Sequence, residues 1–273
     1  MKRSQFIRNA CLSLGAAVVL AACGGGGDVS TTPSADGGDA AAGLWLVGTE
    51  PAFPPFESQD DSGELVGFDI DLMKAIGEQA GVEVQFESLP FDGLIPALQA
   101  GTIEAAISGM TITEERAQTV DFSRPYFRAG LAIAVAEDDT ETTSFESLEG
   151  KTIAVQLGTT GAEMAGTIKD AKISTFDSAP LALQELSNGN ADAVINDAPV
   201  TLDAIATGNI GGVKVVGELI TEEFYGIAMP KDSPNLEALN TALAELIENG
   251  TYDALYEKWF GTTPVGTLPE AGF

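Results

Sequence analysis

The sequence has 273 residues, of which 41 are acidic and 13 basic, with no histidine and two cysteines. A formal charge of −28 excludes nucleic acids and anionic lipid headgroups as partners over most of the surface, because like charges repel each other. Without histidine the chain cannot build a Ser-His-Asp triad, a Cys-His pair or a histidine-ligated zinc site, and two cysteines form neither a metal cluster nor a disulfide framework, so we expect no metal and no cofactor.

Residues 1–22 are typical of an export signal. Basic side chains within the first eight residues precede an apolar stretch, residues 10–22, which is too short to span a membrane as a helix. The segment Leu20-Ala21-Ala22-Cys23 resembles a bacterial lipobox, and this resemblance implies cleavage before Cys23 and attachment of lipid to its sulfur. The alternative is a plain signal peptide with an incidental cysteine.

Residues 23–43 connect this signal to the body of the chain. After Cys23 the segment consists mainly of Gly, Ser, Thr, Asp and Ala, which predicts a flexible linker with a span of roughly 25 Å. No later stretch is apolar enough over about 20 residues to span a membrane. We therefore expect a folded body in the periplasm or on the outer face of the cell membrane, tethered by its N-terminus.

Strands and helices alternate from residue 44 onward. Hydrophobic spacing predicts strands at 44–48, 82–87, 105–108, 151–155, 173–176, 192–196, 213–216 and 226–229. The predicted helices cover 67–80, 92–99, the segment after the Gly/Thr turn at 156–161, 179–187, 234–248 and 251–259. This alternation favours an α/β fold with mostly parallel sheets.

The number of strands suggests two sheets, one within about 44–130 and a second within about 134–218, so the last strand and the last two helices must pack on one of them. Open α/β sheets bind ligands at the carboxyl ends of their strands. Polar or glycine-rich loops follow the predicted strands at 49–56, 90–92, 109–116, 156–161 and 196–199. These loops form the candidate ligand site.

The loop at 48–57 contains three prolines and two phenylalanines. The prolines stiffen the loop, which suits the presentation of Phe53 to a ligand, although Phe53 can equally belong to the core. Phe56 is assigned to the core. Glu50 follows the first strand directly and faces either the cleft or solvent, where glutamates usually lie.

Arg116 is the most informative residue of the loop at 108–117. Thr113 and the two glutamates after it are typical of a helix start, which puts Arg116 at the third helical position. A cation there opposes the helix dipole by about 0.3–1 kcal/mol. A bound carboxylate would explain the placement, because helix N-terminal N–H groups and a guanidinium both favour an anion. A salt bridge to a surface acid is an equally good alternative.

Two later loops are also candidates. Thr160 and Glu163 have the spacing of a capping box, so capping is the default role of Thr160, and the free N–H groups of that turn are a possible anion site. Asp197 ends a strand ahead of Pro199 and is suited either to cap the next helix or to bind an ammonium group. Because Arg116 and Asp197 belong to different predicted sheets, together they are suited to hold a zwitterion.

The body of the chain resembles the periplasmic polar amino-acid-binding proteins of ATP-binding-cassette importers, from about residue 45 to about residue 261. The resemblance rests on the order and spacing of the segments GTEPAFPPFE, GFDIDLMKAI, FDGLIPALQAG, ISGMTITEERAQTVDFSRPYF, GKTIAVQLGTTG, LQELSNGNADAVINDAP, YGIA and NGTYDALYEKWFG. It implies a two-lobed periplasmic-binding-protein fold of type II, in which two α/β lobes joined by two hinge strands close on one amino acid. Lobe 1 would comprise 44–130 and 224–273, and lobe 2 would comprise 131–223.

The resemblance also implies how the common part of an amino acid is held. Arg116 would pair with the α-carboxylate, and Asp197 would hold the α-ammonium group. Backbone groups of Gly109, Thr111 and Thr160 would add hydrogen bonds. These five residues would therefore bind any amino acid, whatever its side chain.

The side-chain pocket would be formed by Glu50, Phe53, Phe91, Ser108 and Gln156. Glu50 supplies a negative charge, and the two rings can stack on a guanidinium. No lysine or arginine among these residues can neutralise an acidic side chain, which disfavours glutamate and aspartate as ligands. Arginine, lysine and histidine fit best, and glutamine is the alternative, because its amide can hydrogen-bond with Glu50 and Gln156.

The expected partners are a free L-amino acid and the permease subunits of the importer, and no nucleic acid. We expect a binding protein rather than an enzyme. The same fold hosts a few enzymes, such as dehydratases of cyclic amino-acid precursors, and acid–base work by Glu50 or Asp197 is the less favoured alternative. A sensory module is a third candidate; it would normally continue into a transmembrane helix and a signalling domain, whereas this sequence ends at Phe273.

Overall fold

The computed structural model describes residues 43–270. The predicted export signal, the lipidation site at Cys23 and nearly all of the predicted linker lie outside the described residues. Within the described range, every helix is too short or too polar to cross a membrane. The described residues all fall within one compact unit of the chain.

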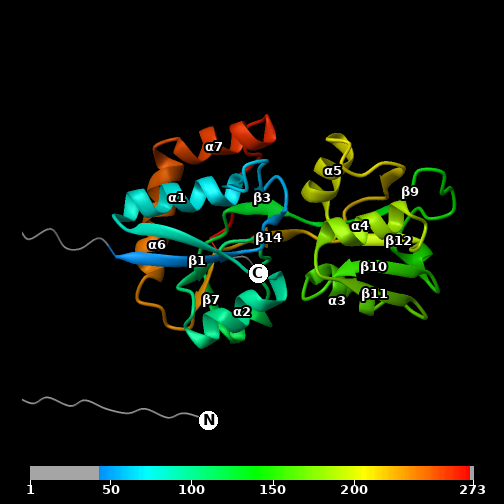
Figure 1. Ribbon diagram of the computed structural model, residues 1–273, viewed down its shortest axis with the longest axis horizontal. Coiled ribbons are helices and arrows are strands. Elements are labelled where there is room, and N and C mark those ends of the chain that lie inside the picture. Colours follow the sequence, from blue (N-terminus) through cyan, green and yellow to red (C-terminus); the bar gives the residue numbers. More distant parts are fainter. Residues whose placement is uncertain (1–42, 271–273) are drawn as a thin grey trace, which may run out of the picture. The chain divides into compact units, whose positions relative to one another are not determined.

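The first sheet has five strands in the order β5-β1-β6-β15-β7. Its strands β1 and β7 are labelled in Figure 1. β1 pairs in parallel with both β5 and β6, whereas β15 is antiparallel to β6 and β7. β15, which comes much later in the chain than the other four strands, therefore lies between β6 and β7. The bounds are Glu83–Ser88 for β5, Leu44–Thr49 for β1, Ala105–Ala106 for β6, Ala228–Pro230 for β15 and Val120–Phe122 for β7.

Helices cover both faces of this sheet, and we call the sheet together with these helices lobe 1. Because side chains alternate between the faces of a strand, Trp45 and Val47 of β1 pack into one core cluster and Leu46 into another. The first cluster includes residues of α1, α6 and α7, and the second includes residues of α2. The helices are α1 (Phe68–Ala80), α2 (Phe91–Ala100), α6 (Leu236–Glu248) and α7 (Thr251–Phe260).

The second sheet repeats this arrangement, with the order β11-β10-β12-β9-β13. β10 is parallel to β11 and β12, and β9 is antiparallel to β12 and β13. With its helices it forms lobe 2, in which α4 and α5 pack on one face and α3 on the other. The bounds are Lys172–Phe176 for β11, Thr152–Gln156 for β10, Ala193–Asp197 for β12, Leu131–Ala136 for β9, Val213–Val216 for β13, Thr160–Gly166 for α3, Ala179–Ser187 for α4 and Ala198–Ala206 for α5.

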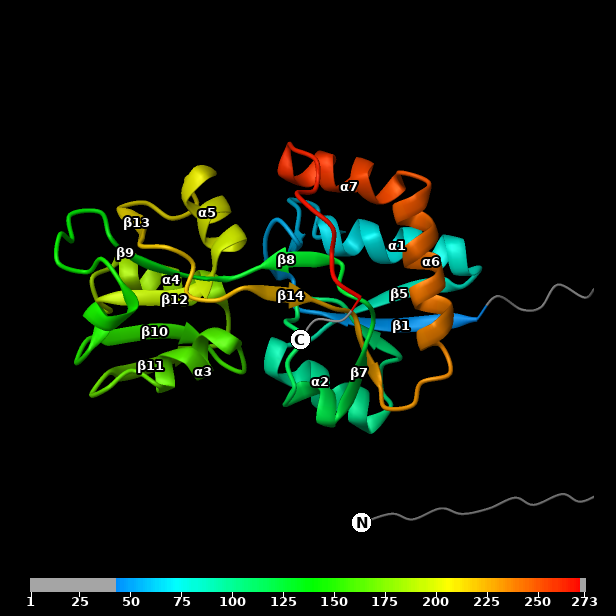
Figure 2. The same cartoon turned by 180° about the vertical axis from the view of Figure 1, so that it is seen from behind.

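Two crossover strands connect the lobes. β8 (Phe127–Ala129) leads out of lobe 1 and β14 (Glu223–Tyr225) leads back into it, and the two pair antiparallel and lie side by side (Figure 2). Each runs directly into the antiparallel strand of the sheet that it enters, β9 or β15. At Gly130 a Cβ atom would lie 2.3 Å from the carbonyl oxygen of Thr221, so the crossovers approach too closely there for any side chain.

The strands and helices predicted from hydrophobic spacing are all present, with ends within about two residues of the predicted ones. Hydrophobic spacing did not predict the short strands β7, β8 and β14 or the hairpin of β2, β3 and β4, because two or three residues carry too little periodicity. The resemblance did imply two hinge strands, which correspond to β8 and β14. β9 was not predicted as a strand of the second sheet, although a continuous apolar run is consistent with a buried strand. The hairpin strands span Ala52–Phe53, Glu57–Gln59 and Leu65–Val66.

The helix predicted to begin at Thr113 is wrong. The Thr113 hydroxyl does accept a hydrogen bond from the N–H of Arg116, at 3.1 Å. However, only one 3-10 turn, η1 (Arg116–Gln118), forms before the chain enters β7. So short a turn has almost no macrodipole, and Arg116 therefore does not oppose a helix dipole.

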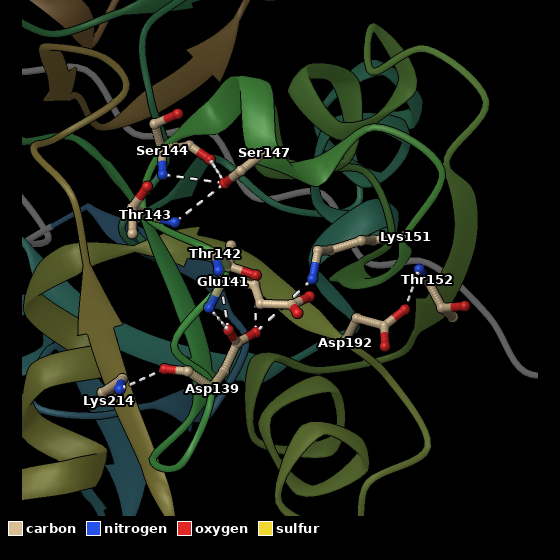
Figure 3. A network of polar contacts seen from close by, with 10 residues as sticks. All are labelled: Asp139, Glu141, Thr142, Thr143, Ser144, Ser147, Lys151, Thr152, Asp192 and Lys214. Atoms are coloured by element: carbon tan, nitrogen blue, oxygen red, sulfur yellow. Dashed lines mark hydrogen bonds and ion pairs between the residues drawn. The ribbon is translucent and has the colours of Figure 1, made fainter.

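A polar network fixes the loop after β9 (Figure 3). The Asp139 carboxylate accepts hydrogen bonds from the N–H of Thr142 (2.9 Å), the hydroxyl of Thr142 (2.8 Å) and the N–H of Glu141 (2.7 Å). These bonds, and the Lys151 ammonium at 3.8 Å, lower the pKa of Asp139 from 3.8 to about 2. Lys214 of β13 adds a hydrogen bond to the Asp139 carbonyl at 2.6 Å, so the network ties this loop to β13 and to Lys151, the residue before β10.

Candidate functional site

A small cavity lies between residues of the two lobes. Only about 10 Å³ of it can hold the centre of a water molecule, which is room for about one water. The two lobes are therefore nearly in contact around this site, and they have to move apart to admit a larger molecule. The cavity lining consists of Phe53, Phe91, Ser108, Gly109, Thr111 and Arg116 from lobe 1 and Gln156, Thr159, Thr160 and Asp197 from lobe 2.

Nine of the ten residues that the sequence predicts to bind ligand line this cavity. The tenth, Glu50, lies behind the lining and is joined to Gln156, with 3.0 Å between Glu50 Oε2 and Gln156 Nε2. Glu50 is only 6% exposed, so its default placement in solvent is wrong. Thr159 lines the cavity although the sequence did not single it out.

The Arg116 guanidinium touches both lobes. It donates hydrogen bonds to the carbonyl of Thr111 in lobe 1 (2.7 Å) and to that of Gly158 in lobe 2 (2.9 Å), and its Cζ lies 5.4 Å from the centroid of the Phe91 ring. Burial lowers the pKa of Arg116, and nearby carboxylates oppose this change. The alternative of a salt bridge is not realised within residues 43–270, where no carboxylate lies within 4.0 Å of it. Further N–H donors of the guanidinium remain for an anionic ligand.

Asp197 ends β12 directly before α5. Its side chain does not cap α5 and instead accepts a hydrogen bond from the Tyr225 hydroxyl. Burial raises the pKa of Asp197 from 3.8 to about 7; Glu223 adds to the rise, whereas Tyr225 and Arg116 oppose it. A cationic ligand group in the cavity would favour the ionised form of this carboxyl group.

Thr159, and not Thr160, caps α3. The Thr159 hydroxyl accepts a hydrogen bond from the N–H of Ala162 at 3.1 Å, so the capping role predicted for Thr160 is wrong. Thr160 is the first helical residue, and its hydroxyl donates to Glu223 at 3.0 Å. This leaves Thr160 among the residues that line the cavity.

Glu50, Ser108 and Gln156 form a polar cluster next to the cavity. The Gln156 amide donates to Glu50 and, at 3.3 Å, to the carbonyl of Asp177, while the Glu50 N–H donates to the Ser108 hydroxyl at 3.0 Å. Burial raises the pKa of Glu50 from 4.5 to about 7, with the Gln156 bond opposing and the charge of Asp92 adding to the rise. A positive group is the ligand feature that this cluster would stabilise.

Phenylalanine rings form part of the cavity wall. Phe56 is fully buried in the core, as predicted, whereas Phe53 lines the cavity and is 7% exposed. The Phe53 ring packs so closely on Gly109 that a Cβ atom there would lie 2.8 Å from Phe53 Cε1. The φ of 53° at Gly109 adds a second reason for glycine at this position.

Two fully buried carboxyl groups support Ser108 and Gly109 from behind. The Ser108 hydroxyl donates to Glu57 at 2.9 Å, and the Gly109 N–H donates to Asp69 at 2.8 Å. Burial raises the pKa of Asp69 to about 6 and that of Glu57 well above its ordinary value, and the charge of Asp69 adds to the rise at Glu57. Because Asp69 takes the Gly109 N–H, only the carbonyl of Gly109 is available to a ligand.

Four buried polar residues around the cavity were not predicted from the sequence. A signal existed for Asp69, which precedes the apolar residues Leu72, Met73 and Ile76 at helical spacing and therefore lies on the buried face of α1. No comparable signal marks the others. The four are Glu57, Asp69, Glu223 and Tyr225. In the part of the chain that the structure describes, no group of three or more acidic or cysteine side chains is arranged to hold a metal ion.

Comparisons with known proteins agree with one another. The family model of the bacterial extracellular solute-binding proteins, family 3, matches residues 46–262. A probable histidine-binding protein of Neisseria gonorrhoeae is 35% identical over 250 residues, which cover 89% of this chain and 91% of the relative. The ABC transporter arginine-binding protein 1 of Escherichia coli (strain K12) is 38% identical over 230 residues, which cover 82% and 93%. An ancestral arginine-binding protein bound to arginine is similar in structure, with a TM-score of 0.78, 49% identity, and coverage of 80% of this chain and 99% of that chain.

Proposed function

This chain belongs to family 3 of the bacterial extracellular solute-binding proteins, and on that premise we propose that it binds one free L-amino acid between its lobes and delivers it to the permease subunits of an ABC importer. The names of its arginine- and histidine-binding relatives support a basic amino acid as the ligand. The proposal places the protein in the periplasm, as a binding protein and not an enzyme.

The observation that carries the proposal is the pair of opposite charges in one cavity. Arg116 and Asp197 line the same small space from different lobes. A free amino acid at neutral pH carries a carboxylate and an ammonium group on one carbon, and a guanidinium and a carboxylate are their natural partners. The pair suits a zwitterion better than a simple anion or cation, each of which would leave one buried charge without a partner.

Hinge motion at the two crossovers opens and closes the cavity. In this proposal lobe 1 receives the amino acid, and closure brings Thr160 and Asp197 of lobe 2 onto it. Because the ligand contacts both lobes only in the closed form, it favours that form by its differential affinity. The permease then distinguishes loaded from empty protein by the arrangement of the lobes.

Glu50 is the proposed determinant of side-chain preference. Within residues 43–270 the hydrogen-bond partner of its buried carboxylate is the neutral amide of Gln156, so a guanidinium, ammonium or imidazolium group would compensate its charge. A neutral glutamine amide can hydrogen-bond here but adds no charge. An acidic side chain would face repulsion from Glu50.

Glu50→Gln should weaken arginine binding by about 10-fold or more, because a hydrogen bond to a charged group contributes about 1.5–3 kcal/mol. Binding of glutamine should change by less than about threefold, since its amide pairs with either side chain. Calorimetric titration of both ligands against both proteins measures the difference. Equal losses for arginine and glutamine would remove Glu50 from the account of specificity.

Calorimetry against the twenty amino acids tests the function itself, after unfolding and refolding to remove carried-over ligand. We expect one-to-one binding of arginine, lysine or histidine. Tight binding of glutamine alone would keep the transport role and overturn the basic preference. Recovery of the ligand after prolonged incubation separates a binding protein, which returns it unchanged, from an enzyme on the same fold.

We also propose that lipid on Cys23 anchors the protein, a view that the lipobox-like sequence at 20–23 supports. Cys23→Ser should move the exported protein from the membrane fraction to the soluble periplasmic fraction, because no lipid can be attached to serine oxygen by the same thioether chemistry. Immunoblots of fractionated cells measure this distribution. A variant that stays in the membrane fraction would show that something other than Cys23 holds it there.

A further inference from the structure

Glu223 occupies an unusual place for a carboxylate. It opens the crossover strand β14 and is only 7% exposed. Within residues 43–270 no cation lies within 4.0 Å of it. Its partners are instead three threonine hydroxyls, donated by Thr111 (2.6 Å), Thr160 (3.0 Å) and Thr221 (3.0 Å).

One oxygen of Glu223 joins the two lobes. Oε2 accepts from Thr111, which belongs to lobe 1, and also from Thr160, the first residue of α3 in lobe 2. Both threonines line the cavity. The two bonds can exist together only while the lobes are close enough for both hydroxyls to reach a single atom, so they are a property of the closed arrangement.

The other oxygen ties Glu223 to the crossovers. Oε1 accepts from the Thr221 hydroxyl, and this hydroxyl in turn accepts a hydrogen bond from the N–H of Leu131, where β9 begins, at 3.0 Å. The carboxylate is therefore fixed to both connections between the lobes. Because the Glu223 side chain is already fixed in place, it loses little conformational entropy when it accepts the hydrogen bonds of Thr111 and Thr160. The net free energy of these bonds is therefore more favourable.

We propose that Glu223 is an inter-lobe clasp, whose carboxylate holds Thr111 and Thr160 together and so sets how long a bound amino acid stays in the cavity. The proposal rests on the function proposed above. Glu223 acts through the two threonines and is a positioning residue for binding. Loss of the clasp should raise the rate of ligand release, because opening no longer breaks these bonds, and should leave the rate of association nearly unchanged.

Release of arginine from the full chain, measured by stopped-flow mixing with an excess of competing ligand, tests the clasp. Glu223→Met keeps the length of the side chain but has no acceptor, and we expect release about 10- to 100-fold faster, in line with charged hydrogen bonds. Thr160→Val should have a similar effect, and the double variant should be little worse than either single one. Glu223→Gln keeps an acceptor oxygen but not the charge, so its release rate should lie between those of wild type and Glu223→Met.

Thr142→Val is the matched control, because Thr142 also donates its hydroxyl to a carboxylate, Asp139, but lies in the polar network of lobe 2 away from the cavity. It should lower the stability of the protein without changing release. The clasp is overturned if Glu223→Met releases arginine at the wild-type rate, if Thr142→Val accelerates release equally, or if the effects of Glu223→Met and Thr160→Val simply add.

A second measurement separates this proposal from the function on which it rests. Small-angle X-ray scattering of the ligand-free full chain reports the separation of the lobes without any ligand. Glu223→Met should shift the ligand-free protein toward the open form and have a larger radius of gyration than wild type, with Glu223→Gln between the two. If no amino acid binds the wild type but this difference is seen, the proposed function fails and the clasp stands; if arginine binds the wild type but leaves Glu223→Met at the same rate, the function stands and the clasp fails.

Discussion

Replacing Arg116 with alanine should abolish measurable binding of every amino acid, whatever its side chain. The guanidinium donates hydrogen bonds to carbonyl groups of both lobes, at 2.7 Å to Thr111 and 2.9 Å to Gly158. These bonds fix its orientation, so its remaining N–H groups can bind the α-carboxylate of the ligand. Removing one partner of a buried charge pair costs about 2–5 kcal/mol, which corresponds to about a 30- to 4,000-fold loss of affinity. Calorimetry with arginine, lysine, histidine and glutamine measures the loss.

Two further variants are compared with Arg116→Ala to establish the cause of its loss of affinity. Arg116→Lys keeps the charge but not the planar fork, and we expect affinities between those of wild type and Arg116→Ala. Arg124→Ala is the matched control: Arg124 lies before the crossover strand β8, pairs with Glu270 at 3.8 Å and does not line the cavity, so this variant should bind as tightly as wild type. If Arg116→Ala only shifted the preference among side chains, Arg116 would not be the partner of the α-carboxylate.

The sequence predicted the fold and the gathering of the cavity residues because both depend on strong patterns. The apolar runs that become β1, β10 and β12 are long enough to be recognised, and polar loops after parallel strands must meet at one edge of a sheet. Arg116 and Asp197 lie in two of these loops, although the helix dipole that seemed to mark Arg116 is not present. They do line one cavity, although their contacts with a ligand remain predictions.

Local rules failed where tertiary contacts decide between near-equal alternatives. Thr159 and Thr160 are adjacent threonines with similar capping ability, and only the fold determines that Thr160 turns to Glu223 while Thr159 caps α3. The helix start at Thr113 has the right side chains, but β7 takes the chain into the sheet after one turn. Glu223 carries no signal at all, because its three hydroxyl partners come from distant segments or from a crossover without periodicity.

Arginine binding should weaken steeply below pH 7. Burial holds the pKa values of both Glu50 and Asp197 at about 7 in the cavity, whereas a bound guanidinium and α-ammonium group favour the ionised carboxylates and lower both pKa values. The complex therefore carries fewer protons than the free protein, and affinity falls as the pH falls. Each carboxyl group contributes about a tenfold loss per pH unit below 7, so affinity at pH 5 should be up to about 10,000-fold lower than at pH 7.

Glu50→Gln separates the two carboxyl groups. In this variant only Asp197 of the two carboxyl groups still titrates, so the loss of arginine affinity between pH 7 and pH 5 should shrink to about 100-fold. Wild type should show the same smaller loss with glutamine, because a neutral amide does not require an ionised Glu50. Calorimetry in buffers of different ionisation enthalpy counts the protons released on binding. Near pH 5 this number should approach two for wild type with arginine and one for Glu50→Gln; an affinity that is independent of pH would mean that neither carboxyl group pairs with the ligand's cations.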